Sequence, residues 1–171
     1  MLDSNFINPT GLPDVNHYST ARDLAKLSIS MINDFPEHYS LYKEKEFTFD
    51  DIRQLNRNSL LWQDDSVDGI KTGHTNDSGY CLAGSAMRGE TRFVSIVLKS
   101  ASEKTRIRDT RRLLDYAFRF YQTKTIVKAY EPLTTVDVWA GINEKVTLGL
   151  ESDLKITLQR NKFKNLELDL P

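Results

Sequence analysis

The feature that most constrains the fold is the stretch from residue 79 to 122, where two apolar segments precede a long amphipathic one. Segments 79–87 and 91–99 are typical of strands, and the glycine of their three-residue connection, Arg88-Gly89-Glu90, is typical of a hairpin. Ser102 is a candidate N-cap for a helix that extends to about Gln122. Its apolar positions recur at helical spacing, namely at Ile107, Leu113, Leu114, Ala117, Phe118 and Tyr121. This arrangement indicates an antiparallel sheet with helices, an α+β domain.

The segments before this stretch are more irregular. Residues 8–13 are dense in turn formers and indicate a surface loop. Ser19 or Thr20 is the candidate N-cap of a helix with an apolar face, and Pro36 is expected to end it. Residues 45–61 indicate short strands or an irregular hairpin, and a polar loop at 63–66 follows.

The composition changes near residues 125–132, and beyond them the apolar residues recur with period two. This pattern predicts an all-β module of short strands over 126–171, after a first domain over 1–125. Its last expected strand, residues 166–170, runs into the end of the sequence, so we expect the β domain to be truncated. The apolar positions are Val136, Val138, Val146, Leu148, Leu150, Leu154, Ile156, Leu158, Leu166, Leu168 and Leu170.

Composition excludes several classes of function. The net charge of −1 gives no general attraction to nucleic acid or to an anionic membrane. The basic stretch 99–112 lacks interleaved aromatic residues and is more typical of a solvated helix face than of a nucleic-acid patch. No metal-ligand spacing, phosphate-binding loop or dinucleotide fingerprint occurs, so we expect no metal and no cofactor. Cys81 is the only cysteine, which excludes an intrachain disulfide.

The triplet Lys71-Thr72-Gly73 carries the chemistry. Penicillin-binding proteins and class A β-lactamases combine such a triplet with a Ser-x-x-K nucleophile motif and a serine-containing loop. Lys71 supplies a cation for a substrate carboxylate, and Thr72 supplies a short hydroxyl. Gly73 has no Cβ, so a peptide-like substrate can pass close to the backbone. The backbone N–H of His74 can then point at a developing oxyanion.

The surrounding sequence resembles the D-alanyl-D-alanine carboxypeptidases, the low-molecular-mass penicillin-binding proteins of the type 5 and 6 group. The resemblance covers the whole chain and is strongest over residues 16–120. It is carried by residues 18–23, 42–49, 52–58, 60–62, 67–75, 79–80, 83–86 and 118–120. It implies a partial penicillin-binding domain, followed by the start of the group's C-terminal β domain.

The resemblance also implies roles for single residues. Lys71, Thr72 and Gly73 match the active-site triplet, and His74 matches the position whose backbone N–H completes the oxyanion hole. Arg106 matches an arginine implicated in binding the substrate carboxylate. The alternative for Arg106 is a surface charge among the neighbouring basic residues, and the sequence leaves both open.

The Ser-x-x-K and Ser-x-Asn elements of the group fall before the point that matches Met1. Ser40-Leu41-Tyr42-Lys43 fits Ser-x-x-K literally, but it follows Pro36 in a polar connection and aligns with a non-catalytic region. We therefore expect the chain to lack its nucleophile and to be inactive alone. We also expect either an associated N-terminal fragment, which would carry Ser-x-x-K, or a swapped or partnered assembly.

The resemblance predicts that the intact enzyme removes the terminal D-alanine from peptidoglycan pentapeptides through an acyl-serine, and that penicillins acylate it. The expected partners are stem peptides ending in D-Ala-D-Ala and β-lactam antibiotics. The expected location is the periplasm, at the inner membrane. Two alternatives remain: a non-catalytic module that binds peptidoglycan peptides, and a β-lactamase relative, against which the β domain argues.

Overall fold

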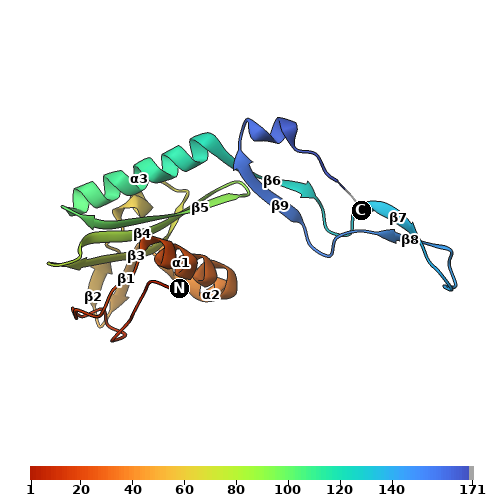
Figure 1. The fold of residues 1–171 in the computed structure, drawn as a ribbon. Helices are drawn as coiled ribbons and strands as arrows, with labels where there is room; N and C mark the ends of the chain where they lie inside the picture. The colour runs from red at the N-terminus through yellow and green to blue at the C-terminus, as the bar shows by residue number, and fades with distance from the viewer. Residues whose placement is uncertain (170–171) are drawn as a thin grey trace. The chain divides into compact units, whose positions relative to one another are not determined.

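The computed structural model describes residues 1–169, which form two compact units, residues 1–119 and the residues from 120 onward. The first unit contains a three-stranded antiparallel sheet in the order β3-β4-β5 (Figure 1). Its strands are β3 (Val67–Thr75), β4 (Gly79–Arg88) and β5 (Thr91–Ser100). Gly89 has a φ of +58° in the β4–β5 turn, where glycine avoids the strain that a side chain would bring. The predicted hairpin is confirmed.

Helix α3 (Glu103–Phe120) covers one face of this sheet (Figure 1). Leu82 and Ala86 of β4 pack in one core cluster with Ile107, Leu114 and Phe118 of α3, together with Leu60, Leu61 and Val67. Gly84 is part of this contact, since a methyl group there would lie 2.8 Å from Cγ2 of Thr110. The prediction of a buried helix face is therefore confirmed at Ile107, Leu114 and Phe118.

Two positions of that predicted face are wrong. Leu113 is 47% exposed, because it lies on the flank of α3 rather than over the sheet. Tyr121 is not helical, because α3 ends at Phe120 and Tyr121 begins strand β6.

The opposite face of the sheet carries α1 (Ala21–Asp34), α2 (Pro36–Tyr39) and the 3-10 helix η1 (Ser40–Lys43). Thr20 caps α1, accepting a hydrogen bond from the Asp23 N–H through its side chain. The helix ends before Pro36, as predicted, but Pro36 also starts α2, where its missing N–H costs no hydrogen bond.

A polar cluster joins this second layer to the sheet. Tyr39 Oη donates to Asp68 Oδ1 at 2.7 Å, and Arg92 Nη1 lies 2.7 Å from the other Asp68 oxygen and 2.7 Å from Ser85 Oγ. Burial raises the pKa of Tyr39, so this hydroxyl stays protonated and remains a donor. A side chain at Gly69 would lie 2.8 Å from Tyr39 Oη. These contacts fix the start of β3, just ahead of the Lys-Thr-Gly triplet.

The remaining elements of the first unit are short. β1 (Glu46–Phe49) and β2 (Ile52–Leu55) form the hairpin expected within residues 45–61, and the 3-10 helix η2 (Ser59–Trp62) leads into the core. None of the helices in residues 1–169 has the length and apolar character needed to cross a lipid bilayer.

The second unit contains two antiparallel pairs, as expected of an all-β module. β6 (Tyr121–Val127) pairs with β9 (Leu154–Gln159), and β7 (Thr134–Asp137) pairs with β8 (Lys145–Leu148). The predicted boundary between residues 125 and 126 falls within β6. The 3-10 helix η3 (Lys162–Asn165) follows β9.

The last predicted strand, residues 166–170, is wrong over its described part. Residues 166–169 form no strand, and Leu168 is 46% exposed. Alternation of apolar and polar residues gives a strand only where a neighbouring strand supplies backbone partners, and within residues 1–169 no strand pairs with residues 166–169. Leu170 lies outside the described residues.

Candidate functional site

The Lys71-Thr72-Gly73 triplet lies in β3, which is an edge strand of the described sheet. An edge strand has backbone groups that no neighbouring strand uses, so an extended peptide can pair with it. Lys71 is exposed, and its Nζ donates to the carbonyl oxygen of Thr72 at 2.5 Å, whereas Thr72 itself is buried. A methyl group at Gly73 would meet only Cβ of Cys81, at 3.8 Å. Packing within the chain therefore does not require a glycine at this position.

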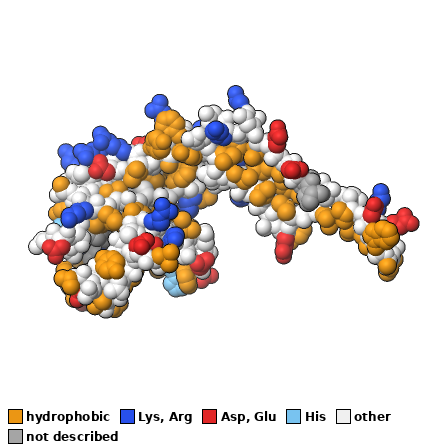
Figure 2. All heavy atoms as spheres, viewed as in Figure 1, with side chains coloured by type: hydrophobic (Ala, Val, Ile, Leu, Met, Phe, Trp, Pro, Cys, Tyr) orange, Lys and Arg blue, Asp and Glu red, His pale blue; other side chains and the backbone are white. Residues whose placement is uncertain are grey.

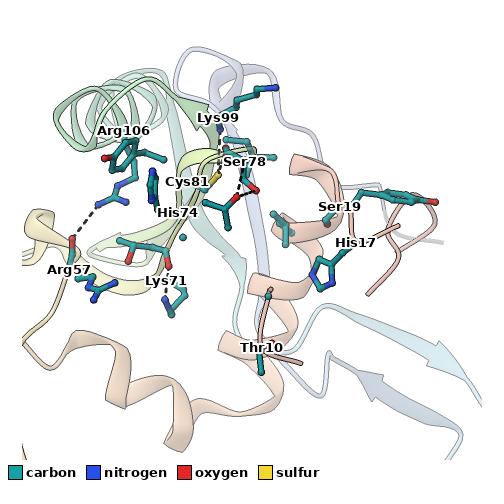
Figure 3. Close-up of a pocket in the computed structure, with 18 of the residues that line it drawn as sticks. Thr10, His17, Ser19, Arg57, Lys71, His74, Ser78, Cys81, Lys99 and Arg106 are labelled. Atoms are coloured by element: carbon teal, nitrogen blue, oxygen red, sulfur yellow. Dashed lines mark hydrogen bonds between the residues drawn. The ribbon is translucent and has the colours of Figure 1, made fainter. Parts of the chain in front are cut away.

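A cavity of about 1080 Å³ lies beside the triplet. The cavity is lined by residues 71–81, the end of β5, the start of α3, Arg57, and the N-terminal segment that leads into α1 (Figure 3). Its polar and charged lining includes the side chains of Thr10, His17, Ser19, Arg57, Lys71, Thr72, His74, Ser78, Lys99, Glu103 and Arg106.

One wall of the cavity is a stack of His74, Tyr80 and Arg106. The rings of His74 and Tyr80 have centroids 4.0 Å apart, and the guanidinium carbon of Arg106 lies 5.7 Å from the Tyr80 ring centroid. His74 and Tyr80 are paired across β3 and β4, which holds both rings at the same end of the sheet. The stack therefore brings together His74 and Arg106, which are far apart in sequence.

Arg106 is not a surface charge, so that alternative is wrong. The residue is only 3% exposed. Its Nη2 donates to Glu103 Oε1 at 2.8 Å and lies 3.5 Å from the carbonyl oxygen of Arg57. Its Nε is buried and has no hydrogen-bond partner within the described residues. A buried guanidinium with an unused donor is suited to an anion in the cavity.

Arg57 and Tyr80 also line the cavity, and the sequence did not single them out as site residues. Both lie in stretches that carry the family resemblance. The only sequence signal at Arg57 is its position directly before Asn58. In the structure, the Asn58 side chain is fully buried and donates to the carbonyl oxygen of Gly69 at 3.0 Å. Arg57, Lys71 and Arg106 together make the cavity a cationic one.

The N-terminal wall of the cavity is held by Asp23 of α1. Its carboxylate accepts hydrogen bonds from Ser4 Oγ at 2.7 Å and from the Asp3 N–H at 2.9 Å. Asn5 and Tyr18 exchange two backbone hydrogen bonds, which close the loop between them. The hydrogen bond from Ser4 is the main reason why the pKa of Asp23 is below its ordinary value.

This lowered pKa predicts loss of the wall in acid. The stabilisation is present above the ordinary aspartate pKa of about 4 and disappears as the pH falls through the lower pKa of the folded state. We expect the hydrogen-exchange protection factors of Asn5 and Tyr18 amides to fall below about pH 4. In Asp23→Asn, protection should be weaker at neutral pH and should not depend on pH in this range. Equal pH dependence in both proteins would contradict the assignment.

Two serines that line the cavity form hydrogen bonds with other hydroxyl groups. Ser19 Oγ pairs with Ser4 Oγ at 2.8 Å, and Ser78 Oγ pairs with Thr75 Oγ1 at 2.8 Å. These hydroxyls therefore contact other hydroxyls and not an amine or imidazole that could take a proton. Ser40 of the literal Ser-x-x-K does not line the cavity, and its Oγ donates to the carbonyl oxygen of Glu37. In residues 1–169, no three His, Cys, Asp or Glu side chains group as metal ligands.

Comparison with known proteins identifies the family. The family model for D-alanyl-D-alanine carboxypeptidase matches residues 1–102, and the model for the C-terminal domain of penicillin-binding protein 5 matches residues 121–170. The chain belongs to the D-alanyl-D-alanine carboxypeptidase family. It is 42% identical over 168 residues to the carboxypeptidase DacA of Escherichia coli K12, and 41% identical to DacC of the same strain. In each case the alignment covers 98% of this chain but 42% of the relative. The chain thus spans less than half the length of these carboxypeptidases.

The carboxypeptidase fold agrees with solved structures. Penicillin binding protein 5 from Haemophilus influenzae superposes with a TM-score of 0.83 and 39% identity, over 94% of this chain and 47% of that chain. Penicillin-binding protein D2 from Listeria monocytogenes, in a cefotaxime-bound form, gives a TM-score of 0.63 and 34% identity, over 67% of this chain and 48% of that chain. The expected family and fold class are confirmed.

Proposed function

We propose that these residues form the substrate-binding wall of a serine-type D-Ala-D-Ala carboxypeptidase that trims peptidoglycan pentapeptides. The observation that carries the proposal is the cationic cavity in which Lys71, Thr72 and His74 of edge strand β3 face Arg106 of α3. A stem peptide ending in D-Ala-D-Ala has an extended backbone and one terminal carboxylate. The edge strand suits the backbone, and the cations suit the carboxylate.

Each residue has a distinct task in this proposal. Arg106 and Lys71 attract the terminal carboxylate, and the hydroxyl of Thr72 donates a hydrogen bond to it. Gly73 lets the substrate approach the backbone. The His74 N–H donates to the carbonyl oxygen of the scissile peptide bond as that oxygen becomes negative, which lowers the barrier to attack. The His74 imidazole packs on the Tyr80 ring and does not act as a base.

The nucleophilic serine and its lysine base come from outside these 171 residues, on an N-terminal fragment or in the part of the protein that matches the remainder of the relatives. The serine oxygen attacks the carbonyl carbon of the penultimate D-alanine, and the lysine takes the hydroxyl proton. The peptide bond breaks, the terminal D-alanine leaves with that proton on its amine, and water hydrolyses the acyl-serine. β-Lactams acylate the same serine. The intact enzyme works in the periplasm, held at the inner membrane.

A fluorescent penicillin tests whether the nucleophile lies outside these 171 residues. The purified 171-residue chain should remain unlabelled, because none of its cavity serines contacts a base. It should nevertheless bind a D-Ala-D-Ala-terminated peptide reversibly in calorimetry, with E. coli DacA as the labelled control. A covalent label on any serine of this chain would overturn the proposal that the nucleophile comes from elsewhere. Reversible binding without label under all conditions, even with an N-terminal fragment added, would favour the alternative of a non-catalytic binding module.

A further inference from the structure

The solvent face of α3 carries a stripe of positive charge that the catalytic proposal does not use. Lys104, Arg108, Arg111 and Arg112 are exposed. Lys104, Arg108 and Arg112 are spaced four residues apart, and Arg111 follows Arg108 by three, which places all four on one side of the helix. Figure 2 shows blue spheres gathered over this part of α3.

This stripe does not help the helix to form. Lys104, Arg108 and Arg112 are like-charged neighbours at i, i+4 spacing, which destabilises a helix. Lys104 also lies near the N-terminus, where the helix dipole disfavours positive charge. Nearby carboxylates offset little of this: Arg108 Nε contacts Asp109 Oδ1 at 2.9 Å, and the Glu103 carboxylate contacts Arg106. For Lys104, Arg111 and Arg112, the described residues provide no ion pair.

The stripe borders a groove of about 590 Å³ between α3 and η2. Ile107 contributes to its floor, and Ser59 and Gln63 of the facing segment offer hydrogen-bonding groups. Arg111 Nη2 lies 3.5 Å from the carbonyl oxygen of Gln63 across it. The groove is lined by Ser59, Gln63, Glu103, Lys104, Ile107, Arg108 and Arg111.

The groove adjoins the candidate active site. Glu103 lines both the groove and the cavity of the Lys-Thr-Gly triplet. Arg57 of the cavity is two residues from Ser59 of the groove, and Arg106 and Ile107 are consecutive in α3. A ligand longer than one peptide can therefore occupy both the groove and the cavity.

We propose that this groove is an exosite for carboxylates of the peptidoglycan strand whose terminal D-Ala-D-Ala enters the cavity. This inference rests on the proposed function. Neighbouring stem peptides carry free carboxylates, which complement Lys104, Arg108 and Arg111, and their amides complement Ser59 and Gln63. The groove has no aromatic lining on which nucleic-acid bases could stack, and its one large apolar residue is buried rather than free to insert into a lipid surface.

The test compares binding of peptidoglycan strands with binding of a single pentapeptide. Lys104→Gln/Arg108→Gln/Arg111→Gln removes three charges from the groove, and Arg22→Gln/Lys26→Gln/Lys43→Gln removes three exposed charges elsewhere in the first unit. Co-sedimentation measures the affinity for uncrosslinked peptidoglycan strands, and calorimetry measures the affinity for one D-Ala-D-Ala pentapeptide. We expect the groove variant to lose about tenfold in strand affinity, as three solvent-accessible charge contacts would give. Its pentapeptide affinity should be unchanged, and the matched variant should behave like wild type.

Other results would overturn the exosite. Equal strand binding by all three proteins would refute it while leaving the carboxypeptidase proposal intact. If the wild-type chain did not bind the pentapeptide, the proposed function itself would be refuted. Strands whose carboxylates are amidated, except for the terminal D-alanine carboxylates, should bind wild type as weakly as the groove variant binds native strands. If polyphosphate, RNA or anionic vesicles bind the groove as tightly as the strands do, the surface is a general anion site and the proposal is wrong.

Discussion

Arg106→Gln is expected to weaken binding of a peptide ending in a free D-alanine carboxylate by about thirtyfold or more. The guanidinium is 3% exposed, lines the cavity, and has an unused buried donor at Nε. Removing one partner of a buried, hydrogen-bonded charge pair costs about 2–5 kcal/mol, because the other charge then loses its compensation. Calorimetry on the 171-residue chain measures the loss.

Two controls separate this role from a structural one. A peptide of the same sequence with a C-terminal carboxamide should bind wild type and Arg106→Gln with equal affinity, because it has no charge for the arginine to meet. Arg112→Gln removes a charge from the exposed face of the same helix and should leave both affinities unchanged. An equal loss for acid and amide would mean that Arg106 only supports the fold of the cavity.

The sequence predicted the parts of the fold that depend on local pattern. The β4–β5 hairpin and α3 follow from an apolar alternation, one glycine turn and a helical period, each of which is complete within about forty residues. The triplet's place on a strand beside a cavity followed from the family resemblance of residues 67–75. Local patterns of this kind predict the structure correctly because they do not depend on which distant segment packs against them.

The rest of the site depends on contacts between segments that are distant in sequence. Arg106 belongs to a basic stretch whose pattern fits an exposed helix face, and only its packing beside Tyr80 of β4 and the carbonyl of Arg57 buries it. The N-terminal wall forms because Ser4 reaches Asp23, which a helix-capping pattern cannot reveal. Residues 166–169 fail as a strand for the converse reason, since their pattern is correct and the described residues supply no partner strand.

The same dependence on packing makes Leu82 the most sensitive position of the core. It is fully buried, and its neighbours across the sheet are Thr72 of β3 and Val97 of β5. Its side chain belongs to the cluster that α3 covers. The strand that carries the triplet and the helix that carries Arg106 therefore depend on one residue that touches no ligand.

Leu82→Ala should lower the free energy of unfolding of the first unit by about 2–5 kcal/mol, through lost burial and the cavity left behind. Its thermal midpoint should fall by roughly 8 °C or more, since each kcal/mol shifts the midpoint of a domain of this size by about 4 °C. Denaturant and thermal melts by circular dichroism measure both. Leu113→Ala, on the half-exposed flank of α3, should cost less than about 1 kcal/mol. If Leu82→Ala were as mild as Leu113→Ala, the sheet and α3 would not share the core described, and Arg106 would lose its physical reason to face His74.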